Sequence, residues 1–162
     1  MINDAVSVFL DEIPICGSLM GLDFGTKTIG IAVSDTEQTI ATGIKTIRRT
    51  KFQKDLLSLK LIIEHRQIKG LVLGLPKNMN GTEGPRCQST RAFANNISNS
   101  IMIPITFWDE RLSTVVAERS LIEANASRQR RTKVIDYVAA SFILQGALDR
   151  LAVLRKGSIF GR

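Results

Sequence analysis

Three acidic positions of this sequence stand out because their neighbours are mainly apolar. The first of them is Asp23. It follows the apolar residues 19–22 and precedes Gly25, where a tight turn with positive φ is expected. A carboxylate in such surroundings must be paired, hydrogen-bonded or bound to a metal ion, because burial of a bare charge is very costly. An aspartate beside a glycine turn also commonly caps that turn through its own side chain. Asp23 by itself therefore leaves a chemical and a structural role open.

Asp136, the second informative acid, lies near the start of an expected helix. Ala139, Ala140 and Ile143 follow it by three, four and seven residues, so helical spacing puts the acid on their apolar face. Small alanine side chains would let this helix approach a sheet closely and bring the carboxylate to Asp23. The alternative is simple placement in the first turn of the helix, where the helix dipole favours an aspartate.

A further pair of acids, Asp109 and Glu110, ends an expected strand and is followed by Arg111. Neighbouring side chains of a strand point to opposite faces of the sheet, so only one of the two acids is expected to face the site. Arg111 then either pairs with the other acid or meets a substrate phosphate. The residues alone leave the choice between Asp109 and Glu110 open.

Acids contributed by two strands and a helix would suit a pair of divalent cations. Mg²⁺ and Mn²⁺ are hard ions that prefer oxygen ligands. Two such ions about 3.5–4 Å apart can activate water and stabilise the leaving oxygen when a phosphodiester bond is cut. The sequence has a surplus of lysine and arginine that would hold the phosphate backbone. A nuclease requires both the metal-binding acids and the positive charge that holds the phosphates. Outside such chemistry, the acids and the surplus of lysine and arginine would be unrelated features.

The composition is that of one globular domain with an anionic partner. The 162 residues are 44% hydrophobic and 23% charged, with 22 Lys and Arg against 15 Asp and Glu, a net charge of +7. Such an excess most often indicates nucleic acid, although many basic proteins only carry solvated Lys and Arg. Cys16 and Cys87 match no disulfide or metal-ligand spacing, and the only histidine, His65, leaves little material for a histidine-based metal site or a serine triad.

The elements that must position these residues alternate between strands and helices. Apolar runs predict a hairpin over residues 19–33, a third strand over 39–47, a helix over 51–66 and a strand over 71–75. A polar loop over 76–86 leads into a helix with Pro85 in its first turn, a strand over 103–107 that ends in residues 108–111, a helix capped by Ser113 or Thr114, a basic linker over 127–133 and a helix over 133–154. This order predicts an α/β fold with a mixed five-stranded sheet, three antiparallel strands followed by parallel ones, flanked by helices.

The first 18 residues are predicted to be an extension that contains a short helix. Val6, Phe9, Leu10 and Ile13 form a helical stripe and Pro14 ends it. A single domain over residues 19–154 and a tail over 155–162 complete the expected organisation. The extension has no basic segment of the kind that starts a secretory signal, and no apolar run of the length that a membrane span needs is expected, so no membrane partner is predicted.

Four motifs together resemble the YqgF/RuvX family: GLDFGTKTIGIAVSD at residues 21–35, GLPKNMNGTEGPR at 74–86, DERLST at 109–114 and KVIDYVAA at 133–140. The resemblance covers about residues 19–152 in order. It implies an RNase H-like fold and a bacterial cytoplasmic nuclease dependent on Mg²⁺ or Mn²⁺. Carried over by motif, Asp23, Glu110 and Asp136 are the catalytic acids and metal ligands, with Asp109 as the alternative to Glu110.

The family is described either as Holliday-junction resolvases or as nucleases that mature the 5′ end of pre-16S ribosomal RNA. We expect the second activity, in ribosome biogenesis, with pre-rRNA or ribosomal precursor particles as partners and a monomer or weak dimer as the working form. Phosphate and base contacts are expected from Lys77, Asn78, Asn80, Arg86, Arg111, Arg128, Arg130 and Arg131.

Three alternatives remain at this stage. Cleavage of a DNA four-way junction would use the same chemistry, but symmetric cutting requires two active sites and therefore a dimer. A phosphate loop like that of actin-like ATPases is suggested by residues 23–27, but those proteins need two such domains and the chain has room for one. A non-catalytic RNA-binding factor would bind precursor RNA without metal-dependent cutting.

Overall fold

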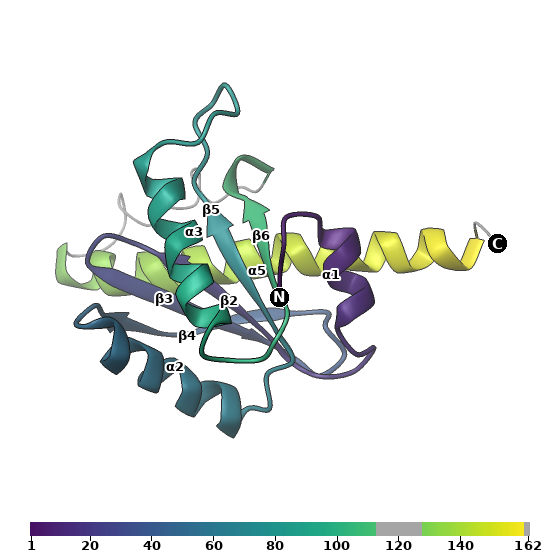
Figure 1. Ribbon diagram of the computed structural model, residues 1–162, viewed down its shortest axis with the longest axis horizontal. Coiled ribbons are helices and arrows are strands. Elements are labelled where there is room, and N and C mark those ends of the chain that lie inside the picture. The colour runs from purple at the N-terminus through teal and green to yellow at the C-terminus, as the bar shows by residue number, and fades with distance from the viewer. Residues whose placement is uncertain (113–127, 161–162) are drawn as a thin grey trace.

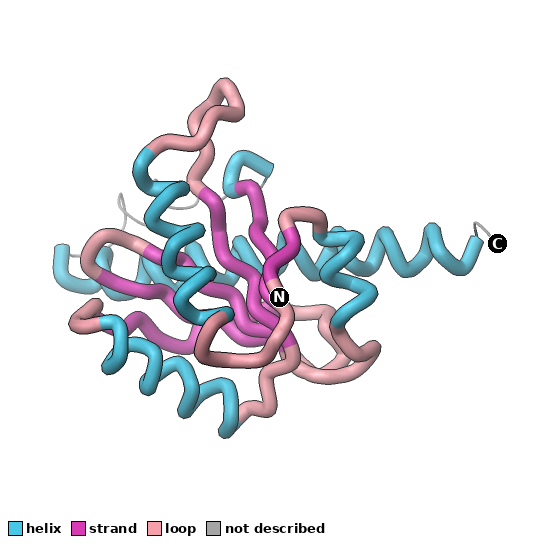
Figure 2. Tube along the Cα trace, viewed as in Figure 1, coloured by secondary structure: helices cyan, strands magenta, loops and turns pink. Residues whose placement is uncertain are grey.

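The structure, a computed structural model, describes the backbone of residues 1–112 and 128–160 and the side chains of residues 1–112 and 137–157. In the described residues one mixed sheet is flanked by helices on both faces (Figure 1, Figure 2). Its elements are, in chain order, β1 Ile2–Asn3, α1 Val6–Glu12, β2 Leu19–Phe24, β3 Thr28–Ser34, β4 Ala41–Arg48, α2 Phe52–His65, β5 Gly70–Leu75, α3 Pro85–Ser98, β6 Ile105–Asp109, the 3₁₀ turn η1 Glu110–Leu112, and α5 Arg128–Phe160.

The strands lie in the order β1-β6-β5-β2-β3-β4. Strands β2, β3 and β4 form the expected antiparallel meander, and β5 and β6 are parallel to β2 and to each other. The two middle strands β2 and β5 are buried along their whole length, which is why their sequences are continuous apolar runs rather than alternating ones. The prediction of a mixed sheet with antiparallel and then parallel strands is confirmed.

The sheet has six strands where the sequence predicted five. The additional strand is β1, which pairs in parallel with β6 through Ile2 opposite Ile105. A two-residue strand is too short to show a periodicity of its own, so only its pairing with β6 defines it. The extension also contains the expected helix, α1, whose Phe9 is fully buried.

Helices α2 and α3 cover one face of the sheet and α5 covers the other (Figure 1). The apolar positions predicted for α2 are buried, with Leu56, Leu59 and Ile63 in contact with the sheet. On the opposite face, Ala140 and Leu144 of α5 pack against the strands. The acids predicted from the sequence lie at the carboxyl ends of β2 and β6, and each side chain is expected on one of these two faces.

Helix α5 is longer than the sequence predicted. It begins at Arg128, so residues 128–133, which we interpreted as a basic linker, are helical, and it continues to Phe160. Arginine, glutamine and lysine are good helix formers, so a charged segment without an apolar stripe can still extend a helix. The helix predicted after Ser113 or Thr114 lies outside the described residues.

One stretch of α5, Tyr137–Gly157, has the length and mean hydropathy of a membrane-spanning helix, which corrects the expectation that the chain has no such run. Its inner face, from Ala139 to Leu151, is buried against the sheet and α1. Core helices of globular domains have the same composition, and the packing of α5 accounts for its apolar character.

Candidate active site

Asp23 is buried on the face of the sheet that α5 covers. It lies one residue before the end of β2, opposite Gly30 of β3, and its side chain is 5% exposed. Side chains two residues apart on a strand share a face. Gly21 lies against α5, because a Cβ atom at Gly21 would come within 2.7 Å of the Leu144 Cβ. Asp23 therefore projects toward the same helix.

Gly74 occupies the neighbouring position on β5. Leu22 pairs with Leu73, so the next residues along these parallel strands, Asp23 and Gly74, lie side by side. A Cβ atom at Gly74 would be 2.6 Å from Oε1 of Glu110 and 2.4 Å from Cδ1 of Ile143 in α5. The Glu110 carboxylate thus occupies the space that a side chain at Gly74 would fill, and Glu110 itself is only 7% exposed.

Asp23 and Glu110 consequently lie on the same face of the sheet, on either side of one strand position that has no side chain. Adjacent strands are about 4.8 Å apart, so this arrangement places Asp23 and Glu110 in neighbouring positions on that face. Both acids have further polar interactions within the chain. The structure therefore brings together two of the sequence-predicted acids.

Asp109, the alternative to Glu110, lies on the other face. It follows Trp108, whose indole ring packs against Gly146 of α5, and alternation along β6 turns Asp109 away from that helix. Arg111 donates hydrogen bonds to the Asp109 carboxylate, the shortest 2.7 Å from Nη2 to Oδ2. These bonds lower the pKa of Asp109, so its carboxylate is held ionised by Arg111 rather than directed toward Asp23.

The position of Asp136 is known only at the level of the backbone. It lies in α5 one turn before Ala140, whose carbonyl oxygen is 3.0 Å from the position of a Cβ at Gly21. The side chains of Asp136, Arg128, Arg130 and Arg131 lie outside the described residues. Their roles in the site stay predictions, and the site that the structure describes has two acids.

The loop between β5 and α3, residues 76–84, carries most of the other predicted contacts. Asn78 and Asn80 are exposed and also hold the loop together, because Thr82 bonds to both of their side chains. Lys77 is half-buried at the start of the loop, and Arg86 is exposed in the first turn of α3. Arg111 reaches the loop from η1, donating a 3.3 Å hydrogen bond to the Met79 carbonyl oxygen.

Sequence reasoning missed two groups that shape this site. Gly74 was treated only as part of a buried strand, although an isolated glycine inside a strand pattern signals the close approach of another group. Arg91 of α3 was also missed: it forms ion pairs with Glu83 of the loop, 2.6 Å, and with Asp4 of the extension, 2.9 Å. Nothing in the sequence around Arg91 indicated these ion pairs, because they form only when the loop and the extension fold against α3.

The donor set fits a divalent cation. Carboxylate oxygens are the ligands that Mg²⁺ and Mn²⁺ prefer, and Asp23 and Glu110 supply such oxygens on one face of the sheet. Among the described residues no group of three or more potential ligands is gathered, since the described part of the chain contributes only Asp23 and Glu110 to this face. A third ligand would have to come from α5, where Asp136 was predicted.

Comparison with known proteins gives consistent results. The model of the family described as "RuvX: Holliday junction resolvase" matches residues 17–150. A protein of Roseobacter denitrificans named "Putative pre-16S rRNA nuclease" is 60% identical over 157 residues, which are 96% of each chain. A protein of the same name from Rhodobacter capsulatus is 60% identical over 95% of this chain and 97% of its own.

Solved structures with a similar fold include two proteins of low sequence identity. Thermus thermophilus RuvC in complex with a Holliday junction superposes with a TM-score of 0.55 at 10% identity, over 88% of this chain and 97% of RuvC. The yeast mitochondrial resolvase Ydc2 gives a TM-score of 0.50 at 11% identity, over 96% of this chain and 88% of its own. The fold is therefore RNase H-like, as the motifs implied.

Proposed function

The chain belongs to the RuvX family, and from this membership we propose that it is a metal-dependent nuclease that cleaves RNA in the 5′-end maturation of pre-16S ribosomal RNA. The proposal is supported by two buried acids, Asp23 and Glu110, in neighbouring positions on the face of the sheet that α5 covers, with Glu110 against Gly74. The choice of RNA as substrate rests on the names of the relatives that are 60% identical over almost the whole chain.

Asp23, Glu110 and Asp136 are proposed to hold two Mg²⁺ or Mn²⁺ ions. When bound, such ions activate water for attack on phosphorus and stabilise the oxygen that leaves. The chain itself orients the acids: β2 fixes Asp23, η1 fixes Glu110, and the missing side chain at Gly74 leaves space for the Glu110 carboxylate. Helix α5 covers this face and keeps the acids out of bulk water, which strengthens their attraction for cations.

The polar loop and the basic residues are proposed to hold the substrate. Lys77, Asn78, Asn80 and Arg86 follow the carboxyl end of β5, next to the strand ends that carry the acids. Arg111 is engaged by the Asp109 carboxylate and the Met79 carbonyl, which gives it a role in positioning the loop. Arg128, Arg130 and Arg131 are proposed to contact phosphates from the first turns of α5.

The test is cleavage of a single-stranded precursor RNA that spans the mature 5′ end. We expect cutting with Mg²⁺ or Mn²⁺ and none after chelation with EDTA. Asp23→Asn and Glu110→Gln should each reduce the rate by about 100-fold or more, since loss of a metal ligand removes several kcal/mol of transition-state stabilisation. Asp109→Asn is the matched control, because this neighbouring acid faces away from Asp23, and it should retain most of the activity.

Two results would contradict the proposal. Undiminished cutting by Asp23→Asn would remove the mechanism, and equal losses in Asp109→Asn and Glu110→Gln would remove the assignment of the acids. Specific RNA binding without cutting by the wild-type protein would instead identify a non-catalytic RNA-binding factor.

Cleavage of DNA four-way junctions is the second candidate, and the description of the matching family model favours it. Symmetric cutting of a junction requires two active sites, so it predicts a dimer at working concentration. Sedimentation velocity separates the two candidates: a strict monomer that cuts precursor RNA excludes symmetric junction resolution.

A further inference from the structure

The loop over residues 76–84 presents a methionine to solvent beyond the carboxyl end of β5. The loop stands beyond the carboxyl ends of β5 and β6 (Figure 1), and Met79 near its tip is 90% exposed. Its carbonyl oxygen accepts a hydrogen bond from Arg111, the residue that directly follows Glu110. An apolar side chain is thus held outside the protein core, at the same end of the sheet as the acids that are proposed to cut the phosphodiester bond.

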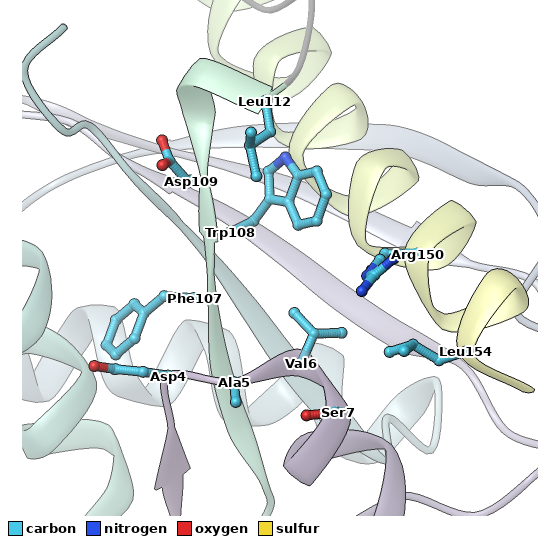
Figure 3. A pocket seen from close by; sticks show the side chains of 10 residues that line it. All are labelled: Asp4, Ala5, Val6, Ser7, Phe107, Trp108, Asp109, Leu112, Arg150 and Leu154. Carbon is cyan, nitrogen blue, oxygen red and sulfur yellow. The ribbon is translucent and has the colours of Figure 1, made fainter. Parts of the chain in front are cut away.

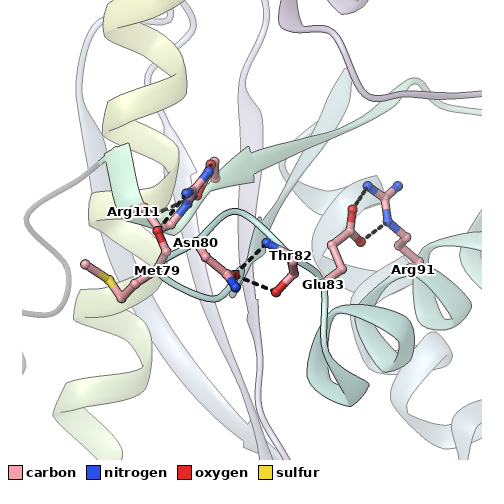
Figure 4. A network of polar contacts seen from close by, with 7 residues as sticks. Met79, Asn80, Thr82, Glu83, Arg91 and Arg111 are labelled. Carbon is pink, nitrogen blue, oxygen red and sulfur yellow. Dashed lines mark hydrogen bonds and ion pairs between the residues drawn. The ribbon is translucent and has the colours of Figure 1, made fainter.

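Hydrogen bonds hold this loop in one conformation (Figure 4). The Asn78 amide nitrogen donates to the Thr82 carbonyl at 2.9 Å, and the Gly81 amide nitrogen donates to the Asn78 carbonyl at 2.8 Å. The Asn80 side-chain oxygen accepts two bonds from Thr82, the shorter 2.6 Å. Met79 lies between Asn78 and Asn80, so its backbone position is fixed in the absence of substrate.

The carboxyl-terminal end of the loop is also anchored to other elements. Glu83 accepts two hydrogen bonds from Arg91 of α3, and Arg91 in turn binds Asp4 of the amino-terminal extension. The hydrogen bonds to Glu83 and Asp4 raise the pKa of the Arg91 guanidinium above its already high ordinary value. Arg91 therefore stays positively charged at every working pH. Binding through a preorganised loop loses less conformational entropy than binding through one that must first become ordered.

We propose that Met79 packs against an unstacked nucleobase of the bound single strand, beside the phosphate that is cut. A methionine thioether is polarizable and makes favourable contacts with aromatic rings. Single-stranded RNA is recognised largely through bases that are turned out of their stack onto protein side chains, and methionine is one of the apolar residues that enter base stacks in nucleic-acid complexes. The neighbouring Asn78, Asn80 and Lys77 supply amides and a positive charge for the adjoining polar groups.

The exposure of Met79 alone does not indicate a contact with a nucleobase, because single exposed apolar residues are normal on protein surfaces. Met102 illustrates the point: it is 97% exposed, yet it lies in the segment before β6, at the other end of the parallel strands from the acids. Met79 differs in its fixed loop and in its contact with the residue after Glu110. Met102 is therefore a control of the same residue type and similar exposure.

The first experiment compares Met79→Ala, Met79→Leu and Met102→Ala, and it rests on the proposed function. We expect Met79→Ala to weaken the binding of a short fluorescein-labelled single-stranded precursor RNA, measured by anisotropy, by about 3- to 10-fold, in line with thioether–aromatic contacts. In cleavage assays KM should rise by a similar factor with little change in kcat. Met79→Leu should retain most of the affinity, and Met102→Ala should match the wild type.

The second experiment replaces one nucleotide at a time by an abasic residue. At the position whose base contacts Met79, the wild-type protein and Met79→Ala should bind the RNA equally, whereas elsewhere the difference between them should persist. A purely structural role of Met79 predicts the same difference at every position and would overturn the proposal.

The outcomes separate this inference from the proposed function. If the wild type cuts RNA and Met79→Ala equals Met102→Ala, the base contact is wrong and the nuclease stands. If the wild type binds without cutting and the position-specific effect appears, the contact stands in a protein that is not a nuclease. If the wild type neither binds nor cuts RNA, both proposals are wrong.

Discussion

At the scale of single residues, the candidate site depends on an absent side chain as much as on the acids. Gly74 separates Asp23 from Glu110 across the sheet, and the Glu110 carboxylate fills the space where its Cβ would be. The sequence predicted Asp23 from its apolar surroundings. It left Asp109 and Glu110 open because side-chain alternation applies within a strand, and β6 ends at Asp109, so Glu110 is oriented by a 3₁₀ turn instead.

Gly74→Ala should therefore damage both the site and the fold. The added methyl group would lie 2.4 Å from Ile143 and 2.6 Å from the Glu110 carboxylate, so one of them must move. We expect the free energy of unfolding to fall by about 1–3 kcal/mol, as for overpacked cores, and cleavage to fall with the displacement of Glu110. Urea unfolding and the precursor-cleavage assay measure the two effects.

Gly157→Ala is the control for this substitution. It lies in the exposed carboxyl-terminal part of α5, with no atom within 4 Å of the added methyl group, and alanine should stabilise the helix by up to about 1 kcal/mol. Wild-type activity and stability in Gly74→Ala would show that the cradle between the acids tolerates a side chain.

At the scale of elements, the active-site end of the sheet is held by contacts between segments distant in sequence. Arg111 connects the end of β6 to the loop over residues 76–84, and Arg91 connects that loop to the amino-terminal extension. The hairpin, the parallel strands and helices α2 and α3 were predictable, because each has its own apolar period. Strand β1 was not, because two residues have no period and their strand exists only through pairing with β6.

The pairing of Asp109 with Arg111 gives this end of the sheet a defined dependence on pH. Arg111 lowers the pKa of Asp109, so the pair contributes its full stability above the ordinary aspartate pKa of about 4. This contribution is lost as the pH falls through the lowered value, because the protonated carboxyl no longer attracts the guanidinium. The urea midpoint of the wild type should fall with acidity in this range, and that of Asp109→Asn should fall less. Parallel pH profiles for the two proteins would contradict this role of the pair.

At the scale of the whole molecule, a net charge of +7 and an acidic site have to coexist. The acids Asp23 and Glu110 are buried beneath α5, whereas Arg86 and the exposed part of the 76–84 loop stand at the surface beyond the strand ends. The negatively charged backbone of a nucleic acid would therefore contact the positive surface residues first. It would reach the carboxylates only at the site of cleavage. The net charge could be predicted from the composition. The burial of the acids below a basic surface could not, because it depends on how the chain folds.

Salt should weaken RNA binding steeply, because binding releases counterions from the phosphate backbone. Each phosphate contact contributes a slope of about −0.7 to log K against log salt for a single strand, so Arg86→Ala should reduce the slope by about that amount. Lys69→Ala removes an exposed charge just before β5, at the opposite end of the strand, and should leave the slope unchanged. Equal slopes for the wild type and Arg86→Ala would show that Arg86 lies outside the footprint of the RNA.

The position of strand β1 also determines where an affinity tag should be attached. The Met1 carbonyl oxygen accepts a 2.8 Å hydrogen bond from the Ile105 amide nitrogen, so sheet pairing begins at the first residue. An affinity tag fused ahead of Met1 would join the chain at this paired edge, close to Arg91 and the loop that it anchors. The carboxyl-terminal part of α5 runs away from the sheet (Figure 1), so the described end of this helix is the better place for a tag. A pocket between the extension, β6 and α5 is lined in part by residues 4–7 of the extension, so a tag at the amino-terminal edge would also lie near this pocket (Figure 3).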